Sequence, residues 1–360
     1  MIPYLIIFFL FLFATVNDNR SSRNSWYYFL FFVASLFVGV RDMIGGYDVY
    51  VYSEIYEADV SFIVGYEMME IGFRYFYIFL KIFSDNRHFM LFVMAFIIFY
   101  FQFRVYKKYS PLLLFALFLF FCKWFLMSFV YLRQGLAMGI ITLAIPYVLS
   151  KQYYKFFFVV LLAMLMHKSA LLFLPFIFIA DRKFSSAQLF YLILITIIIA
   201  VTPLSSFMFS FLADAADDSK VAIYVDKAEG INKFYFIEII ILSLILLKSK
   251  EQFYETALTR MIGNGLFIYV LVSLLGITNP TFVRFTWYYM PFYIIGLCYF
   301  ISFQKDYSNL RVFRSVLVVY FALVFFRMLT IWDAGDFMPY KTIFDDTKRN
   351  SIWQFKEYRN

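Results

Sequence analysis

The stretch that decides the fold is FFFVVLLAMLMHKSALLFLPFIFIA, at residues 156–180. His167 and Lys168 divide it into two apolar runs, and the charged run at 181–183 closes the second. A helix needs roughly 20 apolar residues to cross the hydrocarbon core of a membrane, and about 17 are acceptable. Because His167 and Lys168 interrupt the stretch, we expect two membrane helices, 154–167 and 168–181, both shorter than this length.

The composition extends this interpretation to the whole chain. Of its 360 residues 63% are hydrophobic and 24% aromatic, against roughly 45–50% apolar residues in a soluble domain. Lipid is therefore the expected solvent. The net charge of +8 comes from basic residues in short gaps between apolar runs, which is typical of cytoplasmic loops and not of a nucleic-acid patch. Cys122 and Cys298 lie inside apolar runs, so no disulfide framework or metal site is expected from them.

Apolar runs of this kind recur along the chain and predict an all-α integral membrane protein, a polytopic bundle of about twelve transmembrane helices. The expected spans are 2–16, 25–40, 89–106, 111–130, 134–149, 154–167, 168–181, 187–211, 233–248, 261–278, 284–303 and 312–330. No internal repeat or linker divides them, so residues 1–360 are expected to form a single polytopic membrane domain with a C-terminal segment at 331–360.

The basic loops give the orientation, because cytoplasmic loops carry an excess of Lys and Arg. With twelve spans, all of the basic clusters face the cytoplasm, and the acidic loops 41–65 and 212–232 lie outside. The clusters are Arg20/Arg23, Arg104/Lys107/Lys108, Lys151/Lys155, Arg182/Lys183, Lys248/Lys250 and Lys305/Arg311/Arg314. Residues 66–84 are also apolar, but a crossing there would reverse every later loop. We expect a re-entrant or interfacial helix, with thirteen crossings as the alternative.

Ionisable residues inside or beside apolar helices are costly, so each is a functional candidate. With the predicted orientation, the candidates near the outer face are Arg41, Lys123, Arg133, His167, Arg284, Arg327 and Lys341. Helix-end anchoring is the alternative for each and the preferred interpretation for Lys123 and Arg327. As a set, cations on the outer face run against the positive-inside bias, and a bound anion would explain them.

The first outer loop carries a second sign of anion binding. Gly45 and Gly46 allow a tight turn with N–H groups pointing inward, which together with Arg41 suits a diphosphate. An ordinary turn leaving the membrane is the alternative. The tyrosines that follow are either interfacial belt residues or platforms for sugar rings. They are Tyr47, Tyr50, Tyr52 and Tyr56.

One histidine stands out among the candidates. His167 follows an unbroken apolar helix at the expected outer surface, where it could take a proton from a hydroxyl. A hydrogen-bonded interface residue is the equal alternative, and His88 lies in a polar loop without such a setting. No nucleotide or metal motif is present, so we expect no cofactor and infer that the substrate itself carries the energy for chemistry.

Five fragments in series carry a resemblance to a known family. They are Gly39–Arg41 with Gly45–Asp48, Arg133–Ala137, His167–Ala170, Arg284 with Tyr288 and Tyr289, and Pro339–Lys341. On a chain of this size and hydropathy they resemble the bacterial polysaccharide polymerases of the Wzy type, specifically the EpsG-like family. The fragments span roughly residues 35–345.

The resemblance implies a metal- and nucleotide-independent membrane glycosyltransferase on the outer face of the bacterial cytoplasmic membrane. A growing glycan on polyprenyl diphosphate would move to the non-reducing end of a new lipid-linked repeat unit. It implies that Arg41, Arg133 and Arg284 bind diphosphate and that His167 is the general base, with Asp48 or Glu67 as the competing base. Substrate binding would also involve Tyr47, Tyr288, Tyr340 and Lys341.

The implied partners are the two lipid-linked oligosaccharides, membrane lipid and a chain-length regulator protein, and no nucleic acid. The chief alternative is a flippase for lipid-linked oligosaccharides, although transporters usually hold charges at the midplane and show repeats. A ligase that moves finished glycan shares nearly all of this chemistry. An acyltransferase would need a polar partner for His167 that is not evident nearby in the sequence.

Overall fold

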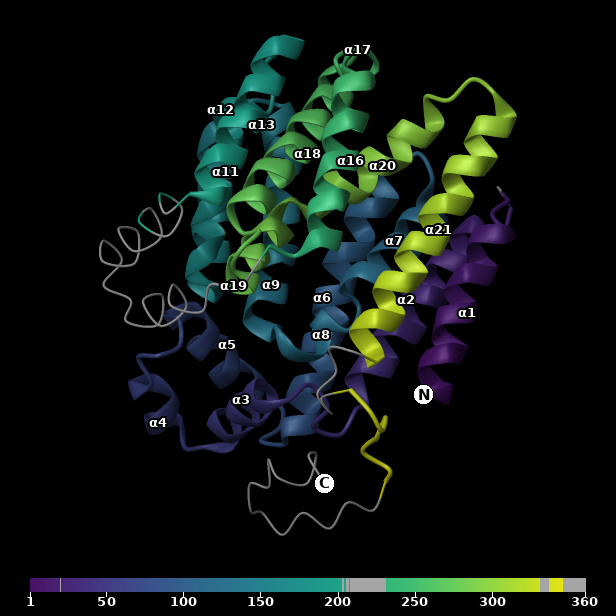
Figure 1. Ribbon diagram of the computed structural model, residues 1–360. Coiled ribbons are helices and arrows are strands. Elements are labelled where there is room, and N and C mark those ends of the chain that lie inside the picture. The colour runs from purple at the N-terminus through teal and green to yellow at the C-terminus, as the bar shows by residue number, and fades with distance from the viewer. Residues whose placement is uncertain (20, 203, 205–206, 208–230, 331–336, 346–360) are drawn as a thin grey trace. The chain divides into compact units, whose positions relative to one another are not determined.

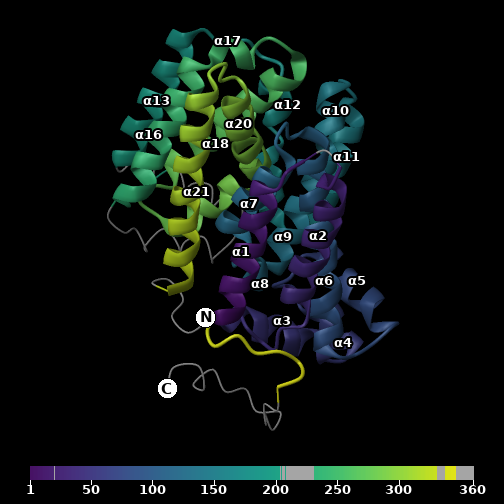
Figure 2. The same cartoon turned by 90° about the vertical axis from the view of Figure 1, so that its right-hand side faces the viewer.

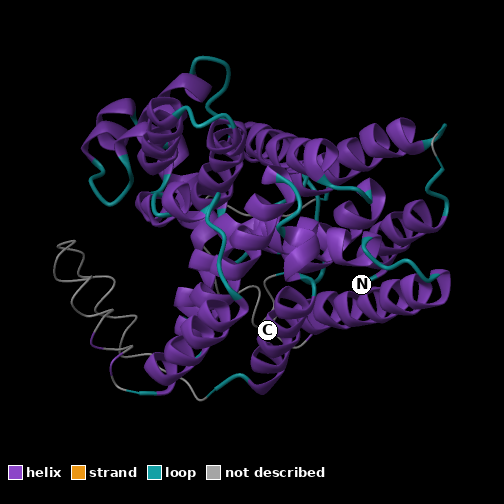
Figure 3. Cartoon of the chain, turned by 90° about the horizontal axis from the view of Figure 1, so that it is seen from above, coloured by secondary structure: helices purple, strands orange, loops and turns teal. Residues whose placement is uncertain are grey.

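The structure, a computed structural model, describes residues 1–19, 21–202, 204, 207, 231–330 and 337–345. These residues form helices and loops with no β-strand among them (Figure 3). An isolated antiparallel bridge joins Arg41 to Thr342. The all-helical class is thus confirmed. Most of the loop 212–232 and most of the segment 331–360 lie outside the described residues.

The chain divides into two compact units that are each built from separate segments. The first comprises Met1–Ala144, Phe158–Leu171 and Gln304–Asn360, and the second comprises Ile145–Phe157 and Leu172–Phe303. A single membrane domain over residues 1–360 stays a prediction.

Helices of the first unit pack along its length (Figure 1). α2 packs against α6, α6 against α9, and α7 against both α1 and α21. Their bounds are α1 Ile2–Val16, α2 Arg23–Gly39, α3 Tyr47–Glu57, α4 Val60–Gly65, α5 Ile71–Lys81, α6 Arg87–Tyr109, α7 Leu113–Trp124, α8 Met127–Val130, α9 Leu132–Ile141, η1 Thr142–Ala144 and α21 Tyr307–Thr330. α11, Tyr153–Met166, and η2, Lys168–Phe173, each contribute residues to both units.

The second unit is organised around one long helix, α18, which packs against α13, α16 and α20 (Figures 1 and 2). Capping boxes at Ser185 and Thr256 start α13 and α18 by satisfying the free N–H groups of their first turns. The bounds are α10 Ile145–Leu149, α12 Phe176–Ile179, α13 Ser186–Val201, α16 Lys233–Lys248, α17 Lys250–Phe253, α18 Ala257–Leu275, α19 Pro280–Val283, η3 Arg284–Tyr289 and α20 Met290–Ser302.

Over the residues that the structure describes, each expected span coincides with a helix or with consecutive short helices, and much of the end of the span expected at 187–211 lies outside those residues. Four segments are long and apolar enough to cross a membrane, namely Arg87–Tyr109, Leu132–Leu149, Ala257–Leu275 and Ser308–Thr330. Shorter apolar helices accompany them, so the protein is a multi-pass membrane protein, whereas the count of twelve spans stays a prediction.

Three short helices, α3, α4 and α5, gather at one end of the first unit (Figure 1). The expected outer loop 41–65 is therefore not irregular but contains α3 and α4. α5 has 11 residues, and at 1.5 Å per residue it extends only about 16 Å, against a hydrocarbon core of about 30 Å. This length suits an interfacial or re-entrant helix better than a crossing.

Candidate functional site

Four side chains of the first unit form a continuous polar network at the end that carries α3, α4 and α5. Glu70 lies at its centre: one carboxylate oxygen is 2.9 Å from His167 Nδ1, and the other accepts a hydrogen bond from Arg133 Nη1 at 2.5 Å. Arg133 Nε donates to the Tyr52 hydroxyl at 3.1 Å. We call Tyr52, Glu70, Arg133 and His167 the Glu70 network.

Three of the four members, Glu70, Arg133 and His167, are placed by the end or first turn of a helix. Glu70 is the residue before α5, but its carboxylate makes no hydrogen bond to the start of α5. It turns instead to the end of α11, where it also accepts the backbone N–H of Lys168 at 3.1 Å. Arg133 lies in the first turn of α9, and Tyr52 lies in α3.

A glycine permits the close approach on which the network depends. Gly72 lies in the first turn of α5, and a Cβ there would be 2.6 Å from Leu165 Cβ and 2.7 Å from Leu165 O. Only a residue without a Cβ lets the start of α5 lie directly against the end of α11. Glu70 and His167 flank this contact, each two residues away from it.

The network holds Glu70 ionised. Burial raises the pKa of Glu70, but the hydrogen bond from His167 and the charge of Arg133 outweigh burial, and the net pKa falls to about 2. The Glu70 side chain is 8% exposed, and those of Arg133 and His167 are 19% and 26% exposed. The carboxylate is thus enclosed, while the histidine and the arginine reach the surface.

An ionised carboxylate at Nδ1 determines what His167 can do. The carboxylate can only accept, so the neutral imidazole carries its proton on Nδ1 and donates it to Glu70. The lone pair is then on Nε2, which can take a proton from a hydroxyl. A carboxylate that fixes the tautomer of a histidine and stabilises the imidazolium is a common arrangement in acid–base catalysis.

Arg133 is committed in part to this network. Nε and Nη1 bind Tyr52 and Glu70, and Nη2 has no hydrogen-bond partner among the described residues. The guanidinium also lies 5.5 Å from the centre of the Tyr52 ring. Arg133 therefore has one donor nitrogen left for an anion, and the N-terminal position on α9 adds the favourable end of the helix dipole.

Arg41, by contrast, is a structural residue. Its side chain is fully buried, and its three nitrogens donate to the carbonyl oxygens of Val38, Ile44 and Phe129 at 2.6–3.1 Å. Burial lowers the pKa of Arg41 to about 9, which still leaves it charged at neutral pH. Main-chain carbonyls therefore occupy the donors that an anion would need, and the diphosphate role expected for Arg41 stays a prediction that this geometry does not favour.

The glycine turn after Arg41 forms, but it serves the fold. Gly45 and Gly46 have φ of 125° and 73°, which favours glycine. A Cβ at Gly45 would lie 2.7 Å from Phe129 O, so the turn packs directly on the chain that also accepts from Arg41. Tyr47 begins α3, although its side chain is outside the described part of the structure.

The expected alternative bases lie at the edge of the network. Asp48 is in the first turn of α3 and is close enough to act electrostatically on Tyr52. Glu67 is exposed in the turn before α5. Neither is hydrogen-bonded to His167, and the carboxylate that is bonded, Glu70, was missed as a site residue. Its position at the start of an apolar segment, like that of His167 at the end of one, was the available signal.

The remaining expected residues are separate from the network. Arg284 opens η3 in the second unit, so its convergence with Arg133 stays a prediction. Tyr288 is buried, which is unsuited to stacking on a sugar.

The Tyr340 hydroxyl donates to Phe37 O at 2.7 Å, and the Tyr340 ring stacks on the Phe37 ring at 4.2 Å. Lys341 O accepts from Asp42 N at 2.9 Å. Tyr340 and Lys341 belong to residues 337–345, which we call the C-terminal strap. The contacts described for these two residues hold the strap against the end of α2 and the loop that follows it.

His88 also has a carboxylate partner, which the sequence did not indicate. Its Nε2 lies 3.1 Å from an oxygen of Asp42, whose side chain is buried. The pair joins the loop that follows α2 to the start of α6. In the described parts of the chain no three His, Cys, Asp or Glu residues are grouped as they would be to hold a metal ion.

Comparison with known proteins identifies the chain. A model of the EpsG family matches residues 24–342. The match covers most of the chain and includes all four members of the Glu70 network, and it confirms the family resemblance found in the sequence. Neither the curated proteins nor the solved structures contain a significant match.

Proposed function

The chain belongs to the EpsG family, and we propose that it is a polysaccharide polymerase that transfers a growing glycan between polyprenyl-diphosphate carriers. The donor is a glycan on polyprenyl diphosphate, and the acceptor is the non-reducing-end hydroxyl of a new lipid-linked repeat unit. Membership gives the general polymerase role. The donor, the acceptor, the face of the membrane and the residues are our proposal.

One observation carries the proposal for the residues: His167 Nδ1 lies 2.9 Å from an enclosed, ionised Glu70. Glycosyl transfer to a hydroxyl requires removal of its proton, and a positioned base contributes about 10²–10⁴ in rate. Glu70 keeps the lone pair of His167 on Nε2 and stabilises the imidazolium that forms. The pair lies at a helix end, which suits a site at the membrane surface.

The bond changes balance without a cofactor. The acceptor oxygen bonds to the anomeric carbon of the donor sugar, and the bond from that carbon to the diphosphate oxygen breaks. The hydroxyl proton passes to His167 Nε2, and the electron pair leaves with the polyprenyl diphosphate. Arg133, whose Nη2 points to no partner among the described residues, binds an oxygen of this anion as its charge develops.

The basic loops support an outer location for this chemistry. Arg104, Lys107 and Lys108 lie at the far end of α6 from its first residue, Arg87. If these cations face the cytoplasm, the start of α6 and the Asp42–His88 pair face outward. The Glu70 network lies at the same end of the first unit, beside α3.

The experiment compares His167→Gln and Glu70→Gln with the wild type. The purified protein in nanodiscs is supplied with the lipid-linked repeat unit, and polymer is followed as a ladder on a gel. Both variants should slow elongation by about 10²–10⁴, because an amide cannot accept the proton and cannot replace the ionised carboxylate. His88→Gln is the matched control, since it changes the other histidine–carboxylate pair in the same way.

Wild-type elongation by His167→Gln would refute its role as base. Cells provide the test against a flippase: a polymerase defect leaves single lipid-linked units on the outer face, whereas a transport defect leaves them on the inner face. Inner-face accumulation in the His167→Gln strain would overturn the enzyme assignment.

A further inference from the structure

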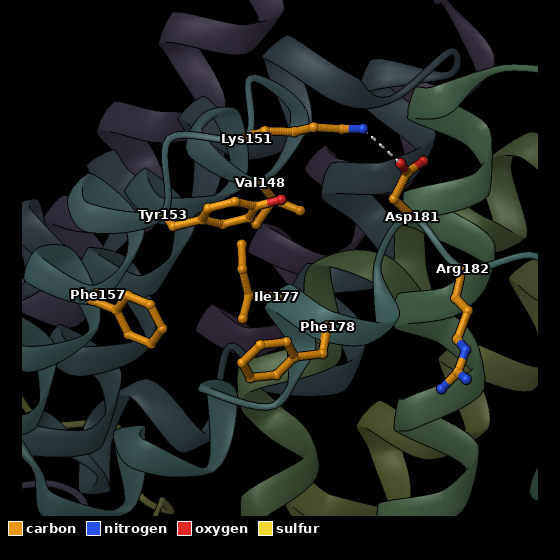
Figure 4. A pocket seen from close by; sticks show the side chains of 8 residues that line it. All are labelled: Val148, Lys151, Tyr153, Phe157, Ile177, Phe178, Asp181 and Arg182. Atoms are coloured by element: carbon orange, nitrogen blue, oxygen red, sulfur yellow. Dashed lines mark ion pairs between the residues drawn. The ribbon is translucent and has the colours of Figure 1, made fainter.

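The second unit contains a cavity that the proposed reaction does not use. Its volume is about 630 Å³, within the usual range of small-molecule sites. Figure 4 shows the side chains that surround it. They are Val148, Lys151, Tyr153, Phe157, Ile177, Phe178, Asp181 and Arg182.

The cavity has a charged rim on one side. Lys151 Nζ lies 3.2 Å from Asp181 Oδ2, and Arg260 Nε donates to Asp181 Oδ1 at 3.0 Å. Asp181 is thus neutralised by two cations at once. Arg182 follows directly in the chain and also lines the cavity, so the rim carries three cations, Lys151, Arg182 and Arg260, against one carboxylate. Its net charge favours an anion.

The rim is held in place by a buried amide. Asn264 in α18 donates from Nδ2 to the carbonyl oxygens of Ile179, Ala180 and Arg182 at 2.8–3.0 Å. Asn264 is fully buried. This single side chain fixes the turn that presents Asp181 and Arg182, so the charged groups are preorganised.

Lys151 occupies a backbone position that suits glycine better. Its φ is 55°, in the left-handed region that non-glycine residues rarely adopt. A lysine there keeps a cation over the cavity at a cost in backbone energy.

The opposite side of the cavity is apolar. Its walls include Phe157, Ile177 and Phe178, from helices α11 and α12. Phe178 is 76% exposed and Tyr153 is 52% exposed, so in a membrane these rings face lipid and not water. The cavity therefore has a cationic headgroup side and an apolar side open to hydrocarbon.

The membrane itself can supply the anion, because the loops at 151–155 and 182–183 are expected at the cytoplasmic surface. The cytoplasmic leaflet carries anionic lipids, and each Lys or Arg near that surface contributes about 1 kcal/mol to their binding. We propose that this cavity binds one anionic phospholipid of the cytoplasmic leaflet. Lys151 and Arg182 bind its phosphodiester, and an acyl chain lies against Phe157, Ile177 and Phe178.

Native mass spectrometry of the detergent-purified protein tests this proposal. Phosphatidylglycerol and phosphatidylcholine of the same acyl composition are titrated separately, and the wild type should bind phosphatidylglycerol at least tenfold more tightly. Lys151→Gly with Arg182→Gln should weaken phosphatidylglycerol binding by about 25-fold, or about fivefold for each cation, and leave phosphatidylcholine binding unchanged. Glycine at 151 eases the backbone, so this variant should remain folded.

Matched controls separate a site from a diffuse charge effect. Lys183→Gln removes the same charge from the same loop but does not line the cavity, and it should change binding by less than about twofold. Phe178→Ala should weaken the binding of both lipids by about fivefold. Phe158→Ala should weaken neither, because its ring is similarly exposed, at 67%, but lies outside the cavity.

Three results would overturn the proposal. Equal affinity for the two lipids would remove the headgroup role, and an equal effect of Lys183→Gln would show that only the surface potential acts. Displacement of phosphatidylglycerol by a tenfold lower concentration of polyprenyl phosphate would identify a different occupant. None of these results depends on polymer formation, so the test of lipid binding is independent of the test of the Glu70 network.

Discussion

Replacing Gly72 with alanine tests how closely α5 must approach α11 for the site to form. The added Cβ would lie 2.6 Å from Leu165 Cβ, whereas ordinary van der Waals contact begins at 3.4 Å. The start of α5 would therefore have to withdraw by the difference, about 0.8 Å. Because Leu165 O is almost as close, at 2.7 Å, rotation of the leucine side chain cannot relieve the clash.

The withdrawal acts directly on the hydrogen bond between Glu70 and His167. A displacement of about 0.8 Å along that bond would lengthen it from 2.9 Å to beyond the hydrogen-bonding range. A misplacement of about 1 Å in a catalytic group costs about 10² in rate. We therefore expect the Gly72→Ala variant to elongate polymer about 100-fold more slowly than the wild type in the nanodisc assay, with the rate normalised to the amount of folded protein.

Gly65 provides the matched control for the same substitution. It lies at the end of α4, and a Cβ there would meet nothing within 4 Å. The Gly65→Ala variant should elongate polymer at a rate within about twofold of the wild-type rate. A wild-type rate for Gly72→Ala would refute the reasoning, as would equal losses in the two variants.

Two further predictions concern charge. The pKa of Glu70, about 2, lies below its ordinary 4.5, so the ionised carboxylate stabilises the fold by about 3 kcal/mol above pH 4.5, and this contribution is lost as the pH falls from 4.5 to 2. The unfolding temperature of Glu70→Gln should accordingly approach that of the wild type as the pH falls from 4.5 to 2. A difference between the two unfolding temperatures that stays constant down to pH 2 would contradict this prediction. Arg41→Lys should lower the yield of folded protein, measured by size-exclusion chromatography, because one ammonium cannot replace donors to three separated carbonyls, a loss of about 3 kcal/mol. Its activity per folded molecule should stay within about twofold; a normal yield with lost activity would restore the ligand role of Arg41.

The fold was predictable where hydropathy alone determines it. The span expected at 233–248 coincides with α16, and that expected at 25–40 lies within one or two residues of α2. Helices α3 and α4 were missed because they are short and partly polar, and tertiary contacts stabilise them: Tyr56 is fully buried and donates its hydroxyl to Ser84 O. The span expected at 284–303 divides into η3 and α20, which hydropathy does not distinguish.

The site was predictable only as a set of candidates. His167 and Arg133 were identified because charge beside an apolar run is costly. Their shared partner was not, since Glu70 is 97 residues from His167 and no period in the sequence connects them. Glu67, three residues away, was named instead as a competing base together with Asp48. The carbonyl partners of Arg41 were not foreseen, because sequence does not reveal whether a guanidinium binds an anion or the carbonyls of its own chain.

The C-terminal strap has a consequence for the order of biosynthesis. Ile343 N donates to Val40 O, Asp42 N donates to Lys341 O, and the Tyr4 hydroxyl donates to Phe337 O across 333 residues. These partners are translated long after the first loop has left the ribosome. The first two helices can enter the membrane early, but the start of α1 and the end of α2 gain these hydrogen bonds only after translation has passed residue 343. Chains that stop before the strap should therefore expose unpaired main-chain groups to quality-control proteases, even though every helix has been inserted.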